Sequence, residues 1–252
     1  FARHAGPRPT DLQHPPAMLT HPLRRPHRRI ASTPVALLAL LPAMLLPRPG
    51  TAQEPDAAGA DGELPREAEI RLLLDDPRVR EAFRVVEESD ARTVAELVEL
   101  TEIPAPPFGE ERRGRRFLEM LRETGVDTAW VDAVGNVLAL RRGSGDGPVL
   151  ALTGHLDTVF PEGTDVAVQV RGDTLYAPGI SDDTRGLVTV LAVLRALNAA
   201  EIRTRGDLLL VGTVGEEGLG DLRGVKHLFR ADGPRIDAFI SVDGTSPDRV
   251  TH

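Results

Sequence analysis

Three short polar clusters in this sequence have the residue types and spacing to hold a metal ion. They are Gly154-His155-Leu156-Asp157-Thr158, Ser181-Asp182-Asp183 and Gly215-Glu216-Glu217-Gly218. Carboxylates gathered at one place repel one another, so such a gathering favours a cation between them. The imidazole of His155 is a suitable zinc ligand near neutral pH. The pattern therefore predicts a metal centre, with zinc as the expected ion and hydrolysis as the expected chemistry.

Polar residues of this kind follow apolar runs that are typical of buried strands. The runs are residues 149–153, 208–214 and 238–242, which precede His155, Glu216 and Asp243. In open α/β sheets the ligand site lies beyond the carboxyl ends of the strands. We therefore expect these side chains to converge, and Asp182 and Asp183 to approach them from the loop before the next helix.

Each cluster also has a purely structural interpretation. His155 and Asp157 point the same way in an extended segment, so Asp157 is expected to accept the second ring N–H of His155; a core histidine with a carboxylate partner is the alternative. One of Asp182 and Asp183 is expected to bind metal, while helix capping is the alternative for the pair.

The pair Glu216 and Glu217 needs a turn, because adjacent residues of a strand point in opposite directions. The flanking glycines, Gly215 and Gly218, permit one. A glutamate beside a metal-bound water is a suitable general base, whereas an exposed acidic turn is the structural alternative.

The order of the elements predicts an α/β fold, a three-layer sandwich with a mostly parallel or mixed central sheet. Apolar periodicity predicts two helices within residues 79–100, divided near Ser89-Asp90, and a helix over residues 110–124 whose charged residues form a solvated face. Further helices are expected at residues 187–197 and 222–229. Strands are expected at residues 128–134, 136–141, 149–153, 166–170, 174–176, 208–214 and 238–242.

Composition narrows the chemistry further. The chain of 252 residues contains no cysteine, which excludes thiolate ligands, a cysteine nucleophile and disulfides. Residues 1–52 hold seven Arg and one Asp, so the net charge of −8 leaves −14 on the remainder. Such an acidic remainder argues against a nucleic-acid partner.

The first 52 residues have the pattern of an export signal. A basic stretch at residues 24–29 precedes the apolar residues 30–46, and Gly50-Thr51-Ala52 is a small-residue cleavage site. A short membrane anchor is the alternative, although two prolines interrupt the apolar stretch. We thus expect upstream residues and a signal peptide at 1–52, a flexible linker at 53–75 and the catalytic region at 76–252, with a periplasmic or secreted location.

Five motifs in order resemble the M20 family of zinc-dependent peptidases and amidohydrolases, over roughly residues 94–243. The motifs are Ile103-Pro-Ala-Pro with Gly109-Glu110, Asp132-x-x-Gly-Asn136, Gly154-His-Leu-Asp-Thr-Val159, Gly179-Ile-Ser-Asp-Asp183 and Gly215-Glu-Glu-Gly218.

The resemblance implies a role for each site residue. His155 and Asp243 would bind the first metal, Asp182 would bridge two metals through a cis Asp182–Asp183 peptide, and Glu217 would bind the second metal. Asp157 would orient His155, and Glu216 would be the general base. The cofactor would be two Zn²⁺ ions, with Co²⁺ or Mn²⁺ as alternatives.

The resemblance also implies a substrate class, an oligomeric state and a longer chain. It predicts hydrolysis of a small peptide or N-acyl amino acid by metal-activated water, and a homodimer formed through a lid domain. The sequence departs from the family pattern at Thr184, where a lysine is usual, and it supplies no histidine for the second metal. We therefore expect an N-terminal part of a longer protein, weakly active or inactive by itself, with the lid and C-terminal parts beyond residue 252.

Two other functions fit some of the same residues. The first is a non-catalytic family member that binds a metal or peptide without turnover, although the intact Glu216 argues against it. The second is a Mg²⁺- or Ca²⁺-dependent phosphohydrolase, since carboxylates suit hard cations. His155 and the lack of a glycine-rich phosphate loop argue against that second function.

Overall fold

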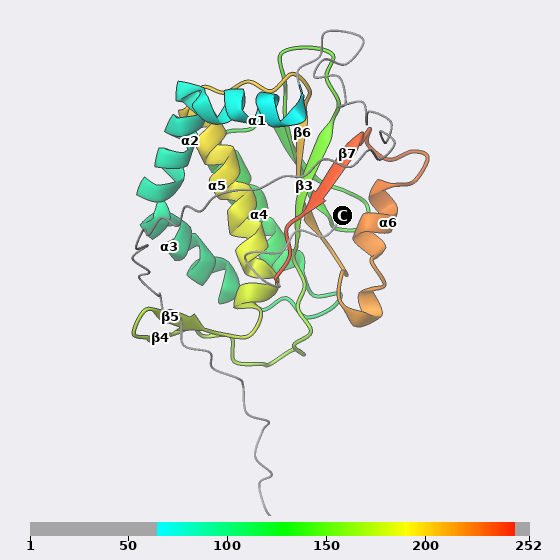
Figure 1. Cartoon of the computed structure of the whole chain (residues 1–252). Helices are drawn as coiled ribbons and strands as arrows, with labels where there is room; N and C mark the ends of the chain where they lie inside the picture. Colours follow the sequence, from blue (N-terminus) through cyan, green and yellow to red (C-terminus); the bar gives the residue numbers. More distant parts are fainter. Residues whose placement is uncertain (1–64, 245–252) are drawn as a thin grey trace, which may run out of the picture. The chain divides into compact units, whose positions relative to one another are not determined.

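The computed structural model describes residues 65–244 (Figure 1). The predicted export signal, the linker up to residue 64 and the residues after 244 lie outside that part of the chain. Within the described residues, helices are too short or too polar to cross a bilayer.

A five-stranded mixed sheet forms the centre of the described region. Its strands are β1 (Thr128–Val131), β2 (Val137–Arg141), β3 (Leu150–His155), β6 (Leu208–Thr213) and β7 (Ala238–Ser241), in the order β1-β2-β6-β3-β7. Strands β3, β6 and β7 are parallel, whereas β1 and β2 run antiparallel to their neighbours. Because β3, β6 and β7 share one direction, their carboxyl ends lie at the same edge of the sheet.

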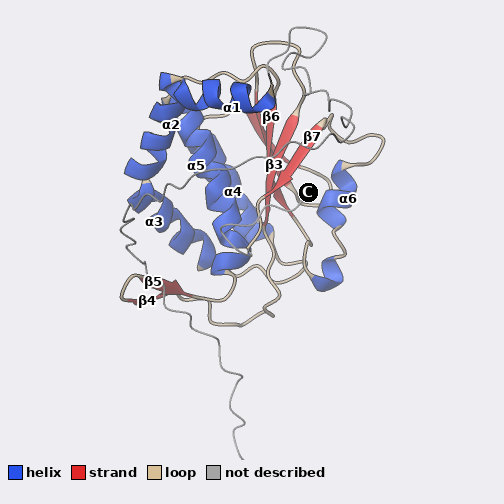
Figure 2. Cartoon of the chain, in the orientation of Figure 1, coloured by secondary structure: helices blue, strands red, loops and turns tan. Residues whose placement is uncertain are grey.

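Helices cover both faces, so the predicted α/β sandwich is confirmed (Figure 2). One face carries α2 (Pro77–Glu88), α3 (Asp90–Thr101), α4 (Glu111–Thr124) and α5 (Arg185–Ala199), and α6 (Arg223–Leu228) lies on the other. The division between α2 and α3 falls at Ser89, as the sequence predicts.

Burial on both faces explains the continuous apolar sequence of β6, every residue of which is buried. Leu210 belongs to the cluster beneath α4 and α5, together with Phe117 and Leu191. Its neighbours Leu209 and Val211 point to the opposite face, where they pack with Leu228 of α6. Strands β1 and β7 are the two edge strands of this sheet, and both are largely exposed.

The predicted strand over residues 128–134 is three residues too long. The chain turns at Asp132, whose Oδ1 accepts N–H groups from Val134, Gly135 and Asn136 at 2.9–3.0 Å. Gly135 adopts a φ of 103° that favours glycine. This turn connects β1 to β2. A small separate hairpin, β4 (Gln169–Arg171) with β5 (Thr174–Tyr176), confirms the hairpin predicted around residues 171–173.

The prediction of a flexible linker up to residue 75 is wrong for its last ten residues. They form helix α1 (Arg66–Asp75), which begins after Pro65 and carries Glu67 and Glu69 in its first turn. Acidic residues there interact favourably with the helix dipole, and the Ala, Glu and Leu content suits a helix. Asp76 then caps α2 by accepting the Arg78 N–H at 2.8 Å.

Candidate metal centre

The carboxyl ends of the three parallel strands bring the predicted site residues together. His155 is the last residue of β3, and it lies opposite Thr213 at the end of β6. Thr153 lies opposite Ser241, the last residue of β7. The Glu216–Glu217 turn follows β6 and Asp243 follows β7, so both reach the edge where His155 ends its strand.

The two ring nitrogens of His155 face different partners. Nε2 lies 2.9 Å from Asp182 Oδ1 and 3.9 Å from Asp243 Oδ1. Nδ1 lies 3.0 Å from the backbone oxygen of Asp157 and 3.6 Å from its carboxylate. The backbone oxygen of Asp157 therefore makes the closer contact with Nδ1. The sequence predicted instead that the Asp157 carboxylate orients the ring.

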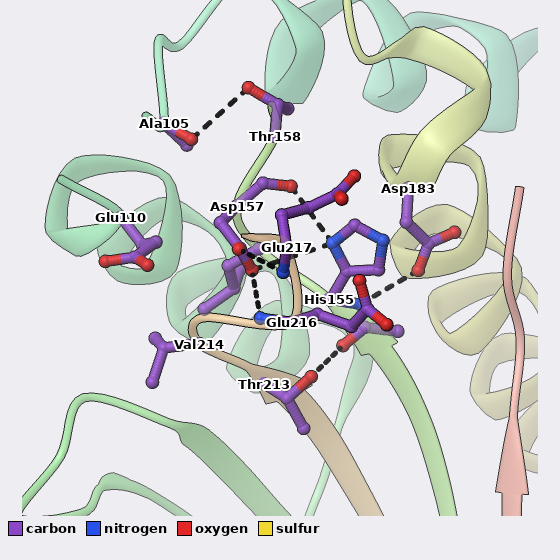
Figure 3. A network of polar contacts seen from close by, with 12 residues as sticks. Ala105, Glu110, His155, Asp157, Thr158, Asp183, Thr213, Val214, Glu216 and Glu217 are labelled. Atoms are coloured by element: carbon purple, nitrogen blue, oxygen red, sulfur yellow. Dashed lines mark hydrogen bonds and ion pairs between the residues drawn. The ribbon is translucent and has the colours of Figure 1, made fainter. Parts of the chain in front are cut away.

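The carboxylate of Asp157 makes its closest contacts with the acidic turn (Figure 3). Its two oxygens accept the backbone N–H groups of Glu216 at 3.0 Å and Glu217 at 2.9 Å. Burial alone would raise the pKa of Asp157, but His155 and these two N–H groups lower it. Asp157 is thus an ionised, fully buried link between the histidine and the two glutamates.

Asp182 and Asp183 lie in different environments, which match the two roles considered for the pair, metal binding and helix capping. The peptide bond between them is cis, as the resemblance predicts. Asp182 is exposed and faces His155, whereas Asp183 is fully buried and accepts N–H groups from His155 at 2.8 Å and Gly186 at 2.9 Å. Asp183 therefore ties the end of β3 to the start of α5.

Excess negative charge dominates the electrostatics. Burial would lower the pKa of His155, yet Asp157, Asp183 and Asp182 raise it to about 10. Burial raises the pKa of Glu216 and of Glu217, and neighbouring carboxylates raise both further. The carboxylates around His155 thus favour positive charge at this position, which is the property a cation site requires.

Two overlapping groups have the donor set and spacing of a metal site. One consists of His155, Asp182 and Asp243, and the other of His155, Glu216 and Glu217. Within each group, one potential ligand atom per residue lies within 4.8 Å of the others. Ligands bound at about 2.0–2.2 Å from one ion need only slightly closer spacing. Nitrogen and oxygen donors of this kind suit zinc, so the residues fit the ion that the sequence predicts.

Two of the supporting residues escaped the sequence analysis. Arg113 was expected on a solvated face of its helix, and that expectation is wrong because its side chain is fully buried. Its guanidinium donates to the backbone oxygens of Thr101, Ile103 and Leu156. The spacing of Arg113, Phe117 and Leu121 places it on the apolar face, which is the signal that could have revealed it.

Asn136 is the second such residue, because its motif was noted without a role. Its side chain donates to Gly224 O at 3.0 Å and accepts from Val214 N at 3.0 Å. It thereby fixes both ends of the segment that carries the acidic turn. His227 lies 3.8 Å from Asp132 and belongs to neither metal group.

Fold and site together define an α/β protein with a histidine–carboxylate centre at the carboxyl edge of a mixed sheet. The resemblance to the M20 family is confirmed, because residues 151–251 match Peptidase family M20/M25/M40. A LysW-lysine/LysW-ornithine hydrolase assigned in Pyrococcus abyssi is 34% identical over 62% of this chain and 41% of its own length.

Solved structures show the same architecture. Aminopeptidase PepT of Bacillus cereus superposes with a TM-score of 0.54 at 24% identity, over 62% of this chain and 44% of that protein. A tripeptidase of Staphylococcus aureus superposes with a TM-score of 0.51 at 26% identity, over the same shares of the two chains. The present chain thus spans less than half the length of these relatives.

Proposed function

We propose that this chain provides the metal-binding part of a zinc-dependent hydrolase that cleaves a peptide or N-acyl amide bond. The observation that carries the proposal is the convergence of His155, Asp182 and Asp243 with the Glu216–Glu217 turn. The family match and the hydrolases among the similar proteins support the reaction class. The names of those relatives support an amide or peptide substrate.

The residues of the chain divide the work of such a reaction. A divalent ion bound here would polarise the scissile carbonyl and make water a stronger nucleophile. Glu216 is half-buried, and burial raises its pKa above the usual value of a glutamate, which makes its carboxylate a stronger base. It would take the proton from the attacking water and deliver it to the leaving amine. Asp157 holds the Glu216 backbone in place for both transfers.

The decisive test replaces Glu216 with glutamine in the protein, using the longer product if the reading frame continues past His252. The amide keeps the size of the side chain but cannot accept the proton. We expect kcat for a di- or tripeptide or an N-acyl amino acid to fall by about 10²–10⁴-fold. Zinc content, measured by atomic emission, should change little.

Glu119→Gln is the matched control, because Glu119 lies on the exposed side of α4. It should keep full turnover. Wild-type protein that binds zinc but cleaves none of these substrates would favour the non-catalytic binding function instead. Equal kcat for Glu216→Gln and wild type would remove Glu216 from the mechanism.

We also propose export to the periplasm or beyond the cell. The support lies in the sequence of residues 24–52, where basic, apolar and small-residue segments follow one another. After expression in a bacterial host, the exported protein should begin at Gln53 when its N-terminus is sequenced. Protein that keeps residues 24–52 and stays with the membrane fraction would instead support the anchor.

A further inference from the structure

Glu110 and Arg223 form a partly buried ion pair beside the acidic turn. Arg223 Nη2 lies 2.7 Å from Glu110 Oε1, and the two side chains are 24% and 5% exposed. The same Glu110 oxygen accepts the Phe108 N–H at 3.1 Å, and the Phe108 ring lies 4.5 Å from the Arg223 guanidinium carbon. The pair therefore joins the loop before α4 to the first residue of α6.

The Arg223 guanidinium also packs directly against the backbone that precedes the general base. A Cβ atom at Gly215 would lie 1.9 Å from Arg223 Nη1, so only glycine leaves room for this contact. Gly220 packs in turn against the Gly215 backbone, which closes the turn on itself. Gly215 has a φ of 62°, a conformation that glycine adopts readily and also leaves readily.

The turn is consequently held between two charged groups. On one side the Asp157 carboxylate accepts the N–H groups of Glu216 and Glu217. On the other side the guanidinium of Arg223 packs against Gly215. Figure 3 shows Glu110 and Val214 on the side of the acidic turn away from Asp183.

Arg223 also borders a cavity. Phe108, Glu110 and Arg223 line a cavity of about 620 Å³, whose other walls include Leu118 and Val134. On the side away from Gly215, the contacts that hold the guanidinium are the bond to Glu110 and the stacking on Phe108. Nη1 of Arg223 is buried without a hydrogen-bond partner among residues 65–244, in keeping with a steric role for that atom.

We propose that the Glu110–Arg223 pair is a positioning device that sets the Glu216 carboxylate by immobilising the 215–220 turn. Neither residue touches the reacting atoms. The catalytic part of this inference rests on the proposed function, whereas the effect on the turn does not. A misplacement of about 1 Å at a reacting group can cost about 10²-fold in rate, so a loosened turn would lower kcat.

The test compares Arg223→Met, which removes the charge, with Arg223→Lys, which keeps the charge but loses the planar contact. Lys226→Met is the matched control, because Lys226 forms an exposed ion pair with Asp221 in the same segment. Hydrogen exchange of the peptide covering residues 214–220 is the first measurement, and zinc affinity and the steady-state constants follow.

For Arg223→Met we expect exchange in residues 214–220 to accelerate by about tenfold, with β3 and β6 unchanged. We expect kcat to fall by about 10–100-fold with less than about a threefold change in KM. Arg223→Lys should lie between wild type and Arg223→Met. Lys226→Met should match wild type in every measurement.

Unchanged exchange in residues 214–220 would overturn the proposal, and so would acceleration spread evenly over β6 and α6, which indicates general destabilisation. If Arg223→Met does not fold, Glu110→Gln provides the same comparison with a smaller change of shape. If wild type cleaves no substrate, the proposed function fails, but the exchange measurement still decides whether the pair immobilises the 215–220 turn.

Discussion

Asp157 links the two halves of the metal centre through its backbone and its side chain. Its backbone oxygen lies 3.0 Å from His155 Nδ1, while its carboxylate accepts two N–H groups from the acidic turn. Asp157 therefore couples the orientation of the His155 ring to the position of Glu216. This explains why a fully buried carboxylate is retained beside other carboxylates, which would otherwise repel it.

Arg113 provides the sharpest stability prediction at the level of single residues. Replacing Arg113 with methionine leaves the backbone oxygens of Ile103 and Leu156 buried without their donor. An unpaired buried polar group costs about 1–3 kcal/mol, so we expect the free energy of unfolding to fall by about 3 kcal/mol. Urea unfolding followed by circular dichroism measures the change.

Arg115→Met, on the exposed side of the same helix, should alter stability by less than about 0.5 kcal/mol. A loss for Arg113→Met no larger than that control would show that water replaces the guanidinium at no cost. The buried donor role would then be wrong.

The residue types of the site were predictable, but the residues that support it were not. His155, Asp182 and Glu216 stand in short motifs whose spacing limits where their side chains can go. Arg223 and Glu110 meet across 113 positions of sequence, and no local pattern specifies such a pair. The resemblance assigns the metal role to Asp182 rather than Asp183, whereas the residue types alone leave the two open.

At the level of elements, β3 and α5 approach each other closely because glycines face a carboxylate. A Cβ atom at Gly186 would lie 2.1 Å from Asp183 Oδ1, and one at Gly154 would lie 2.9 Å from Asp183 Oδ2. The space that two side chains would have filled is occupied by the Asp183 carboxylate. This contact determines how closely the start of α5 packs against the end of β3.

We predict that Gly186→Ala destabilises the protein by about 1–3 kcal/mol, as overpacking does. Helix propensity alone would give the opposite sign, because alanine favours a helix over glycine by about 1 kcal/mol. Gly145→Ala is the control, since nothing lies within 4 Å of its added Cβ. Thermal unfolding shows whether Gly186→Ala lowers or raises the stability of the protein. An increase in stability would contradict the steric argument.

Strongly patterned elements were predictable and locally ambiguous ones were not. The apolar run of β6 and the hairpin at residues 169–176 follow directly from composition and turn residues. Helix α1 was missed because several of its leucines are exposed, so no apolar face marks it in the sequence. The predicted strand at residues 128–134 is too long because the side chain of Asp132 ends β1, and no glycine or proline marks that point in the sequence.

At the level of the whole molecule, the sheet brings distant segments to one charged edge, and both metal groups share His155. Strand β7 is a largely exposed edge strand, and Asp243 follows it. A cation at this edge would therefore bind three strand ends and the loop before α5 together. Binding and folding stability should be coupled, because an unfolded chain cannot present these ligands as one set.

This coupling predicts that zinc raises the free energy of unfolding of the metal-free protein. At a free zinc concentration of 100 times Kd, the increase should be about 2.7 kcal/mol. Asp182→Asn should lose most of that increase, because the amide is a weaker ligand beside His155 Nε2. Asp221→Asn, a carboxylate that is 83% exposed and lies outside both groups, should keep it. Chemical unfolding with and without a chelator measures each increase, and equal zinc effects in both variants would mean that zinc binds elsewhere than at the edge formed by β3, β6 and β7.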